Sequence, residues 1–269
     1  MADRPVSGLP CALEHRAEIE RRMGGRPPAV FLDYDGTLTP IVENPEEAVI
    51  SVSMREVVRS LARRCPVCVV SGRDRRTVQR LMGFEDLVVA GSHGFDIWSP
   101  ERGEIGHEAS AGYEGLIGEV EGRLREELRG IGGVVIEPKR ASVAVHYRHV
   151  AAEGRPRVQE VVDALLASRP GELKVTPGKM VYEVQPNLEW DKGRAVLYLI
   201  QTLGLEDDFP IYLGDDVTDE DAFRALSGRG VGIYVGEPDD PEAAGRTTAA
   251  DYLLRSVDEV ERFLDSLAR

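Results

Sequence analysis

Long apolar runs and cysteines are scarce in this chain of 269 residues. No run of 18 apolar residues occurs, which excludes a membrane-spanning helix. The first residues lack a basic stretch followed by an apolar one, so we expect a cytoplasmic protein. Cys11, Cys65 and Cys68 are too few and too unevenly spaced for a disulfide framework. Cys65 and Cys68 form a C-x-x-C pattern, but the apolar run after it favours small core residues over a redox pair.

Positive charge is in deficit, since 33 basic residues face 47 acidic ones and the formal net charge is −14. This balance argues against nucleic acids and anionic membranes as partners. A site for an anionic substrate would need its own local positive charge. A compact lysine ammonium can act where an arginine fork cannot. Unless their positions are accidental, the four lysines of the chain are therefore candidates for such a site: Lys139, Lys174, Lys179 and Lys192.

The rest of the composition is that of an ordinary globular protein with ample material for a core, with 42% hydrophobic and 30% charged residues. Apolar runs of strand length alternate with amphipathic stretches of helix length. This alternation predicts an α/β core, a Rossmann-like parallel sheet with helices on both faces, over residues 1–105 and 187–269. Residues 106–186 instead follow the pattern helix-strand-strand twice, which predicts an inserted antiparallel α+β cap domain.

Two carboxylates follow the first apolar run of the predicted core, Ala29–Leu32, in the segment Asp33-Tyr34-Asp35-Gly36-Thr37. Residues that follow a buried strand lie at the carboxyl edge of the sheet, where open α/β folds bind their ligands. Two neighbouring acids repel each other unless a cation lies between them, so the pair predicts a bound Mg²⁺ or a similar hard ion. The alternative is an Asp-Gly turn with solvated carboxylates.

Two other core elements also meet polar residues. Ser71 and Gly72 follow the predicted strand 67–70, where a hydroxyl and a backbone N–H could bind a phosphate oxygen. The alternative for Ser71 is a plain helix N-cap. Lys192 opens a predicted helix, where a cation opposes the helix dipole and requires an anion nearby. Asp191 as N-cap supplies part of that requirement.

The segment Gly214–Asp221 follows the predicted strand 210–213 and places five carboxylates within seven residues. Such a cluster repels itself strongly without a metal ion or a helix N-terminus to offset it. An acidic helix start explains the residues from Thr218 to Asp221. It does not explain Asp215 and Asp216, which stand directly at the strand end.

Taken together, Asp-x-Asp-Gly-Thr, Ser, Lys and Gly-Asp-Asp-x-x-Asp, in this order, resemble the haloacid dehalogenase-like phosphohydrolases over residues 29–99 and 187–235. The resemblance implies that Asp33 attacks phosphorus and forms an aspartyl-phosphate. It implies that Asp35 protonates the leaving group and then activates water. It further implies that Ser71 and Lys192 hold the transferring phosphoryl group.

The same resemblance implies an Mg²⁺ ion bound by Asp33, the main-chain carbonyl of Asp35 and Asp215, with Asp219 beside or behind them. Phosphoryl transfer requires positioning and charge neutralisation more than covalent chemistry, so these residue types suit the reaction. Carboxylate attack divides one difficult displacement into two easier steps.

Within the cap, Gly178–Pro186 is similar to the sugar-binding signature of trehalose-6-phosphate phosphatases. Residues 139–148 resemble the upstream strand pair of that family and residues 91–94 its hinge-side loop, while Gln185 stands where the family commonly has Arg. Lys179 and Glu183 are an even number of residues apart and would share one strand face, either for sugar hydroxyls or as an ion pair of little worth. The implied substrate-binding residues are Gly72, Arg73, Ser92, His93, Gly94, Lys139, Arg140, His146, Arg148, Lys179 and Glu183.

This resemblance implies Mg²⁺-dependent hydrolysis of a small-molecule substrate, trehalose 6-phosphate. Three alternatives remain open: a phosphatase of sucrose phosphate or a hexose phosphate, a catalytically silent sugar-phosphate-binding module, and a phosphomutase. The intact set of Asp33, Asp35, Lys192 and Asp215 argues against the silent module. A monomer is the default expectation, although the sequence does not determine the oligomeric state.

Overall fold

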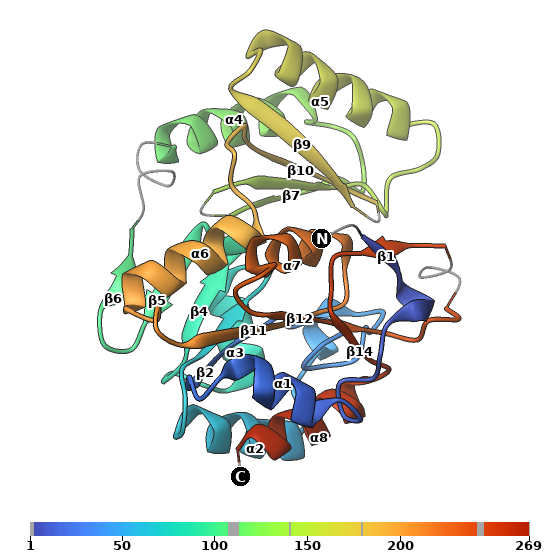
Figure 1. Ribbon diagram of the computed structural model, residues 1–269. Coiled ribbons are helices and arrows are strands. Elements are labelled where there is room, and N and C mark those ends of the chain that lie inside the picture. Colours follow the sequence, from blue (N-terminus) through green and yellow to red (C-terminus); the bar gives the residue numbers. More distant parts are fainter. Residues whose placement is uncertain (1–2, 107–112, 140, 179, 241–244, 269) are drawn as a thin grey trace. The chain divides into compact units, whose positions relative to one another are not determined.

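The chain divides into two units, residues 1–105 with 190–269 and residues 106–189. The computed structural model describes residues 3–106, 113–139, 141–178, 180–240 and 245–268 (Figure 1). The domain limits expected from the sequence, after residues 105 and 186, stay a prediction. None of the helices in the described ranges is long and apolar enough to cross a membrane.

The first unit contains an eight-stranded sheet in the order β14-β12-β11-β2-β3-β4-β5-β6. The strands from β14 to β4 run parallel, and β5 and β6 add an antiparallel edge. Their bounds are β2 (Pro28–Leu32), β3 (Val67–Val70), β4 (Val88–Gly91), β5 (Asp96–Ser99), β6 (Gly103–Ile105), β11 (Phe209–Gly214), β12 (Val231–Val235) and β14 (Tyr252–Leu254). A separate two-stranded ladder joins β1 (Arg4–Pro5) to β13 (Thr247–Thr248).

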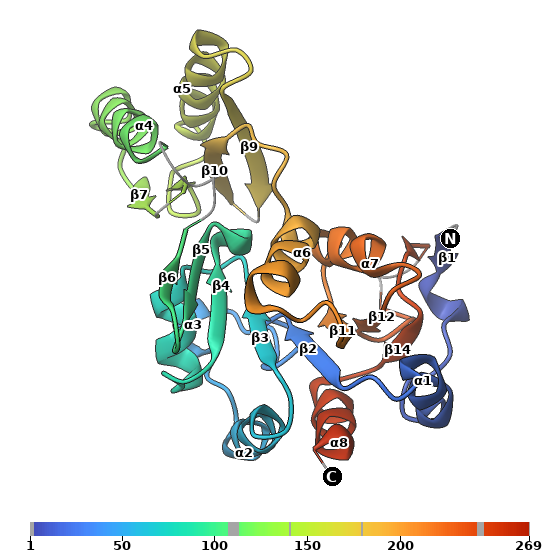
Figure 2. The same ribbon diagram turned by 60° about the vertical axis from the view of Figure 1, so that its left-hand side comes forward.

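Helices cover both faces of this sheet, as predicted. Figure 2 shows α6 and α7 on one side of the strands and α2 and α8 on the other. Their bounds are α1 (Arg16–Met23), α2 (Val52–Ala62), α3 (Arg75–Met82), α6 (Lys192–Leu203), α7 (Glu220–Leu226) and α8 (Val257–Leu267). Four single turns of 3₁₀-helix are η1 (Val6–Gly8), η2 (Pro45–Glu47), η3 (Ser92–Gly94) and η4 (Val217–Asp219). Parallel strands covered on both faces are apolar on both faces, which explains the continuous apolar runs of the sequence.

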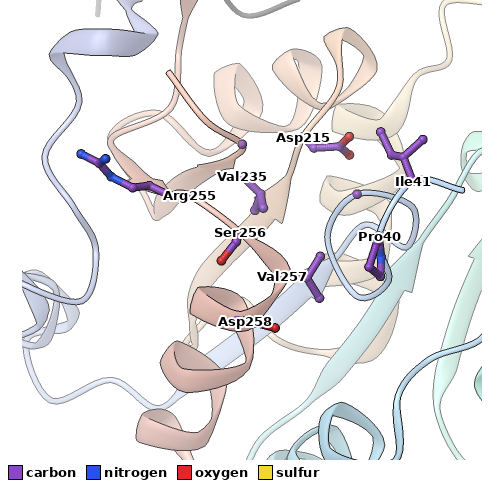
Figure 3. Close-up of a pocket in the computed structure, with 10 residues that line it drawn as sticks. Pro40, Ile41, Asp215, Val235, Arg255, Ser256, Val257 and Asp258 are labelled. Atoms are coloured by element: carbon purple, nitrogen blue, oxygen red, sulfur yellow. The ribbon is translucent and has the colours of Figure 1, made fainter. Parts of the chain in front are cut away.

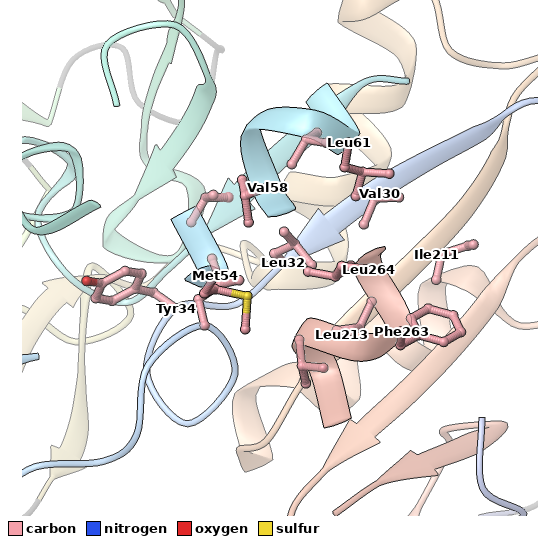
Figure 4. Packing of buried hydrophobic residues seen from close by; sticks show 14 of the residues in the cluster. Val30, Leu32, Tyr34, Met54, Val58, Leu61, Ile211, Leu213, Phe263 and Leu264 are labelled. Carbon is pink, nitrogen blue, oxygen red and sulfur yellow. The ribbon is translucent and has the colours of Figure 1, made fainter. Parts of the chain in front are cut away.

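Two hydrophobic clusters line the two faces of the sheet. In one, Val30 and Leu32 of β2 pack with side chains of α2 and α8, among them Leu61 and Phe263 (Figure 4). In the other, Phe31 of β2 packs with side chains of α6 and α7. Successive residues of β2 therefore point to opposite faces, and burial on both sides fixes the point at which the chain leaves the sheet.

The second unit is an antiparallel sheet, in the order β7-β8-β10-β9, that packs against two helices. The bounds are β7 (Val135–Pro138), β8 (Val143–His146), β9 (Leu173–Gly178), β10 (Val181–Pro186), α4 (Glu114–Glu127) and α5 (Arg155–Ser168). Val143, Val145 and Val184 face the helices and are fully buried with them. The predicted α+β character of this segment is confirmed.

One helix start and one strand are details that the sequence does not indicate. The first helix begins at Arg16, with His15 at its N-cap position and the His15 ring bonded to the carbonyl of Cys11. The edge strand β14 was not predicted, since three apolar residues are too short a run to distinguish from a turn. The sheet is therefore wider than the sequence indicated.

The C-x-x-C pattern belongs to the core. Cys65 and Cys68 are buried free thiols, and burial raises the pKa of Cys68 to about 12. A thiol that stays protonated is a poor nucleophile. The interpretation of these residues as small core side chains is confirmed.

Candidate active site

Three strand ends bring the polar segments of the first unit to one edge of the sheet. Strand β2 lies between β3 and β11, with Leu32 paired to both Val69 and Leu213. The backbone N–H of Asp33 continues this ladder and donates to the carbonyl of Leu213 at 2.9 Å. Asp33, Ser71 and Asp215 therefore leave neighbouring strands at nearly the same level, which is the usual ligand-binding edge of a parallel sheet.

Three carboxylates form a cluster at this edge, since one oxygen from each of Asp33, Asp215 and Asp219 lies within 4.8 Å of the others. Asp219 is completely buried and firmly held. It accepts a hydrogen bond from the Tyr212 hydroxyl at 2.6 Å and one from the backbone N–H of Asp216 at 2.9 Å. The strand β11 and the turn η4 thus fix this carboxylate before any ligand binds.

Lys192 is the cation of the cluster. Its Nζ lies 3.0 Å from Oδ1 of Asp33 and 2.7 Å from Oδ1 of Asp219, and its side chain is 3% exposed. The anion that a lysine in the first turn of a helix requires is therefore supplied from two other elements. Asp191 caps the same helix by accepting from the backbone N–H of Arg194 at 2.8 Å. The expected cap and the tertiary ion pair coexist.

One ammonium does not balance three clustered carboxylates. Burial raises the pKa of Asp33 to about 7, against the opposing effect of Lys192. Burial and the charge of Asp33 raise the pKa of Asp215 to about 9. In the described structure, Oδ1 of Asp215 is buried without a hydrogen-bond donor. An oxygen-rich cluster with excess negative charge and an unused buried oxygen fits a hard divalent cation such as Mg²⁺.

Gly36 shapes the cradle of this cluster, and alanine there should disrupt it. Its φ is +74°, and an added Cβ would lie 2.1 Å from Oδ2 of Asp215. Because Asp215 would have to move, we expect Gly36→Ala to lower any turnover that depends on this cluster by ~10²-fold or more, and to raise the concentration of divalent cation that the turnover requires. The measurement is turnover as a function of Mg²⁺.

Gly24 provides the matched control, because its φ is +61° and nothing lies within 4 Å of an added Cβ. Gly24→Ala carries the same kind of backbone strain, worth roughly 1 kcal/mol, without displacing a ligand. Equal losses of activity in the two variants would mean that strain, not the approach to Asp215, explains the effect.

The raised carboxyl pKa values also predict how a divalent cation such as Mg²⁺ would stabilise the protein if it binds to this cluster. The pKa of Asp33 is raised from 3.8 to about 7 and that of Asp215 from 3.8 to about 9. The folded state therefore keeps protons that the unfolded state releases. Stability without metal should therefore fall as the pH increases from about 4 to about 9. A bound cation displaces these protons, so the rise in melting temperature on adding Mg²⁺ should grow with pH. A shift in melting temperature that is the same at every pH would contradict this expectation.

The Ser71 loop is anchored by the predicted hinge-side loop. Asp74 caps α3 by accepting from the N–H groups of Arg76 and Thr77, so the interpretation of Ser71 as the N-cap is wrong. The Ser71 hydroxyl instead accepts from the backbone N–H of Arg73 at 3.1 Å, two residues on. Its own donor proton remains available for a ligand oxygen.

The η3 turn packs directly against this loop. The N–H of His93 donates to the carbonyl of Ser71 at 2.8 Å, and the N–H of Ser92 donates to the carbonyl of Arg73 at 2.7 Å. A Cβ on Gly72 would lie 2.7 Å from the His93 imidazole, so a larger residue at this position would displace the His93 ring. Gly94, at φ +92°, completes the turn. Five of the predicted substrate-binding residues, Gly72, Arg73, Ser92, His93 and Gly94, thus lie together in the first unit.

Asp35 has a partner that the sequence did not indicate. Nε and Nη2 of Arg73 each lie 2.5 Å from an oxygen of its carboxylate. The family resemblance implies a substrate-binding role for Arg73, and no spacing signal connects residues that are 38 positions apart.

The second unit gathers the other predicted residues on the sheet face opposite its helices. Glu183 of β10 accepts from Lys139 Nζ at 3.1 Å and from the Ser142 hydroxyl at 2.7 Å. His146 of β8 lies 2.8 Å from Glu137 of β7. The face therefore carries two polar groups, a largely buried one around Glu183 and a half-exposed pair of His146 and Glu137. Among the described residues, Glu183 forms an ion pair with Lys139.

Four other residues of the cap prediction have different outcomes. Lys179 and Arg140 lie outside the described residues, so the shared strand face of Lys179 and Glu183 stays a prediction. Arg148 is exposed in the turn after β8. Gln185 donates to the Thr176 hydroxyl at 2.8 Å, so in this chain the position where the family commonly has Arg contributes to the sheet itself.

A cavity of about 450 Å³ opens beside Asp215 in the first unit. Figure 3 shows Pro40, Ile41 and Val257 on one side of Asp215, while Arg255 points away. Because Gly36 and Asp215 both line this cavity, solvent and a hydrated cation can reach the carboxylate cluster without crossing the hydrophobic core. An entry path of this kind is one requirement of a metal site.

Comparison with known proteins gives a consistent result. The model of the trehalose-phosphatase family matches residues 31–257. A trehalose-phosphate phosphatase of Mycobacterium bovis is 41% identical over 271 residues, which span 99% of this chain and 68% of that protein. Among solved structures, an Aspergillus fumigatus trehalose-6-phosphate phosphatase aligns with a TM-score of 0.68 and 29% identity, covering 97% of this chain and 99% of the other. The C-terminal domain of the Candida albicans trehalose-6-phosphate phosphatase shares the fold, with a TM-score of 0.72 and 24% identity over 97% of this chain and 98% of the other.

Proposed function

The chain belongs to the trehalose-phosphatase family, and we propose that it hydrolyses trehalose 6-phosphate to trehalose and inorganic phosphate. The expected enzyme class, a phosphoric monoester hydrolase, is confirmed by this membership. The observation that carries the proposal is the buried cluster of Asp33, Asp215, Asp219 and Lys192 at the carboxyl edge of the sheet.

In the first step, an oxygen of Asp33 attacks phosphorus while the bond from phosphorus to the sugar oxygen breaks. The proton of Asp35 passes to the departing oxygen, so that trehalose leaves as a neutral alcohol. Water then attacks phosphorus of the aspartyl-phosphate while Asp35 takes a proton from the water. The Asp33 carboxylate is regenerated and inorganic phosphate is released. Lys192 lies 3.0 Å from the nucleophile, where it neutralises charge that the phosphoryl group brings.

Asp33, Asp215 and the main-chain carbonyl of Asp35 would hold Mg²⁺, which neutralises phosphoryl oxygens when bound. Asp219 directs its oxygens toward Lys192, Tyr212 and the N–H of Asp216, which supports a role in orienting the ammonium beside the metal. Ser71 would donate its hydroxyl proton to a phosphoryl oxygen, because its acceptor side already serves Arg73.

The polar sheet face of the second unit supports recognition of the sugar. Lys139, Ser142, Glu183 and His146 offer both donors and acceptors, which vicinal hydroxyl groups require. When a sugar binds, its hydroxyl groups can replace the hydrogen bonds that these side chains now make with one another. A site built to bind hydroxyl groups discriminates strongly against analogues that lack one of them.

The test is release of inorganic phosphate from a panel of sugar phosphates, with and without Mg²⁺. We expect trehalose 6-phosphate to be hydrolysed with the highest kcat/KM, at least ~10²-fold above sucrose 6-phosphate and glucose 6-phosphate. Equal turnover across the panel would remove the trehalose assignment. Release of no phosphate from any ester would favour the silent binding module, and a sugar product that retains its phosphate would favour a phosphomutase.

A further inference from the structure

We propose that Arg73 is a positioning residue that holds the carboxylate of Asp35, the acid and base of the reaction, and that it does not contact the sugar. This inference rests on the proposed function, because it assigns a role relative to that reaction. It replaces the substrate-binding role that the sequence analysis gave to Arg73.

The first observation is the geometry of the ion pair. Nε lies 2.5 Å from Oδ2 of Asp35 and Nη2 lies 2.5 Å from Oδ1, a two-pronged arrangement that fixes both the distance and the plane of the carboxylate. Lysine, with a single point charge, cannot define that plane. The Arg73 side chain is 18% exposed and that of Asp35 is 35% exposed, so the pair is partly shielded from water while Asp35 remains accessible.

The second observation is that Arg73 is itself anchored on several sides. Its backbone N–H donates to the Ser71 hydroxyl, and its carbonyl accepts from Ser92. Its third guanidinium nitrogen, Nη1, donates to the carbonyl of Pro45 at 2.8 Å. Because both the backbone and the guanidinium of Arg73 are anchored, the ion pair holds the Asp35 carboxylate in a defined position.

The third observation is the contact between Arg73 and the aromatic ring of Tyr34. The guanidinium carbon of Arg73 lies 5.9 Å from the ring centre of Tyr34, a residue that is fully buried. The Tyr34 hydroxyl donates to the carbonyl of Ala48 at 2.5 Å. This hydrogen bond fixes the ring of Tyr34, the residue between Asp33 and Asp35 in the sequence. The guanidinium of Arg73 packs over the fixed ring, which limits its movement.

The fork leaves Asp35 able to react. Each carboxylate oxygen has two lone pairs, and the fork occupies one on each. The remaining lone pairs can carry the proton that the sugar oxygen takes up and can accept a proton from water. Without the fork, the Asp35 side chain would be free to rotate about its bonds, since no other hydrogen bond to its carboxylate is recorded among the described residues.

The experiment compares two leaving groups in Arg73→Gln, Arg73→Lys and Asp35→Asn. A sugar alkoxide needs a proton to leave, whereas p-nitrophenolate does not. We expect Arg73→Gln to lower kcat for trehalose 6-phosphate by ~10²-fold or more with KM within about threefold of wild type. The first-turnover burst of p-nitrophenol from p-nitrophenyl phosphate should stay within about threefold, because formation of the aspartyl-phosphate from this ester does not need the acid.

Asp35→Asn should show the same selectivity, and Arg73→Lys should recover part of the loss because it restores one of the two contacts. Arg76→Gln is the matched control, an exposed arginine on α3 close by in sequence, and should leave both activities unchanged. A raised KM with unchanged kcat in Arg73→Gln would overturn the proposal in favour of a sugar contact. Equal losses on both esters, or no loss, would overturn it in favour of a purely structural role.

The two proposals fail in distinguishable ways. If wild-type protein hydrolyses p-nitrophenyl phosphate and glucose 6-phosphate but not trehalose 6-phosphate, the substrate assignment falls. The same comparison with glucose 6-phosphate as the alkyl ester then still decides the role of Arg73. Should Arg73→Gln not fold, as judged by thermal unfolding, Arg73→Lys carries the comparison, because it retains the charge.

Discussion

Asp33→Asn is expected to lower turnover of trehalose 6-phosphate by at least ~10⁴-fold, because the amide removes the attacking oxygen while keeping the shape of the side chain. The fold should survive, since Lys192 retains Asp219 at 2.7 Å and the backbone of Asp33 still bonds to Leu213. We expect the free energy of unfolding to change by no more than about 1–2 kcal/mol. Initial rates of phosphate release and urea unfolding measure the two quantities.

Asp86→Asn makes the same chemical change at an exposed loop position and should leave both quantities unaffected. A second readout is trapping with beryllium fluoride, a mimic of the phosphoryl group, which should modify the wild-type Asp33 carboxylate and not the variant. Substantial activity in Asp33→Asn, or an adduct on a different carboxylate in active protein, would refute the assignment of the nucleophile.

Lys192→Met should be costly both for catalysis and for stability. It removes the one ammonium from a buried cluster of three carboxylates, so turnover should fall by ~10³-fold or more. Without Mg²⁺ the variant should lose about 3–5 kcal/mol of unfolding free energy, which is the usual result of leaving buried charges uncompensated.

The loss of stability in Lys192→Met should increase with pH. Lys192 lowers the pKa of Asp33 and of Asp215 against the stronger effect of burial, so its removal raises both values further. At about pH 5 protonation neutralises Asp33 and Asp215, so the deficit should be smaller there than at about pH 8. Lys174→Met is the matched control, because Lys174 donates to the carbonyl of Leu188, and no carboxylate among the described residues pairs with it. A deficit that is equal at the two pH values would argue against electrostatic compensation.

Much of the active site could be predicted from the sequence because strand ends in a parallel sheet have a fixed meaning. Apolar runs such as Ala29–Leu32 are buried on both faces, so a carboxylate that follows one must lie at the edge. Asp33, Ser71 and Asp215 each follow such a run, and β3, β2 and β11 prove to be neighbours. The sequence also predicts that Lys192 requires a nearby anion. The positive end of the helix dipole depends only on where the helix begins, which the local sequence indicates.

The contacts of the cap residues were less predictable. Strand periodicity places Lys179 and Glu183 on one strand face, and this stays a prediction because Lys179 lies outside the described residues. Among the described residues, Glu183 contacts Lys139 and Ser142, which stand more than 40 residues earlier in the chain. Periodicity indicates which residues share a face of one strand. It does not indicate which side chain on the neighbouring strand or loop reaches across, because that depends on register and on the path of the connecting turn.

The sequence by itself determined the α/β architecture, the inserted antiparallel unit and the order of the reactive residues along the chain. All three follow from local patterns of burial and from the topology that such patterns permit. Only the tertiary structure decided three contacts of the site. Arg73 forms a two-pronged ion pair with Asp35, and Asp219 accepts hydrogen bonds from Tyr212 and Lys192. Gly36 lies so close to Asp215 that a side chain at this position would collide with its carboxylate. These are distances of a few ångströms between residues far apart in sequence, and they depend on how loops of fixed backbone geometry aim their side chains at one another.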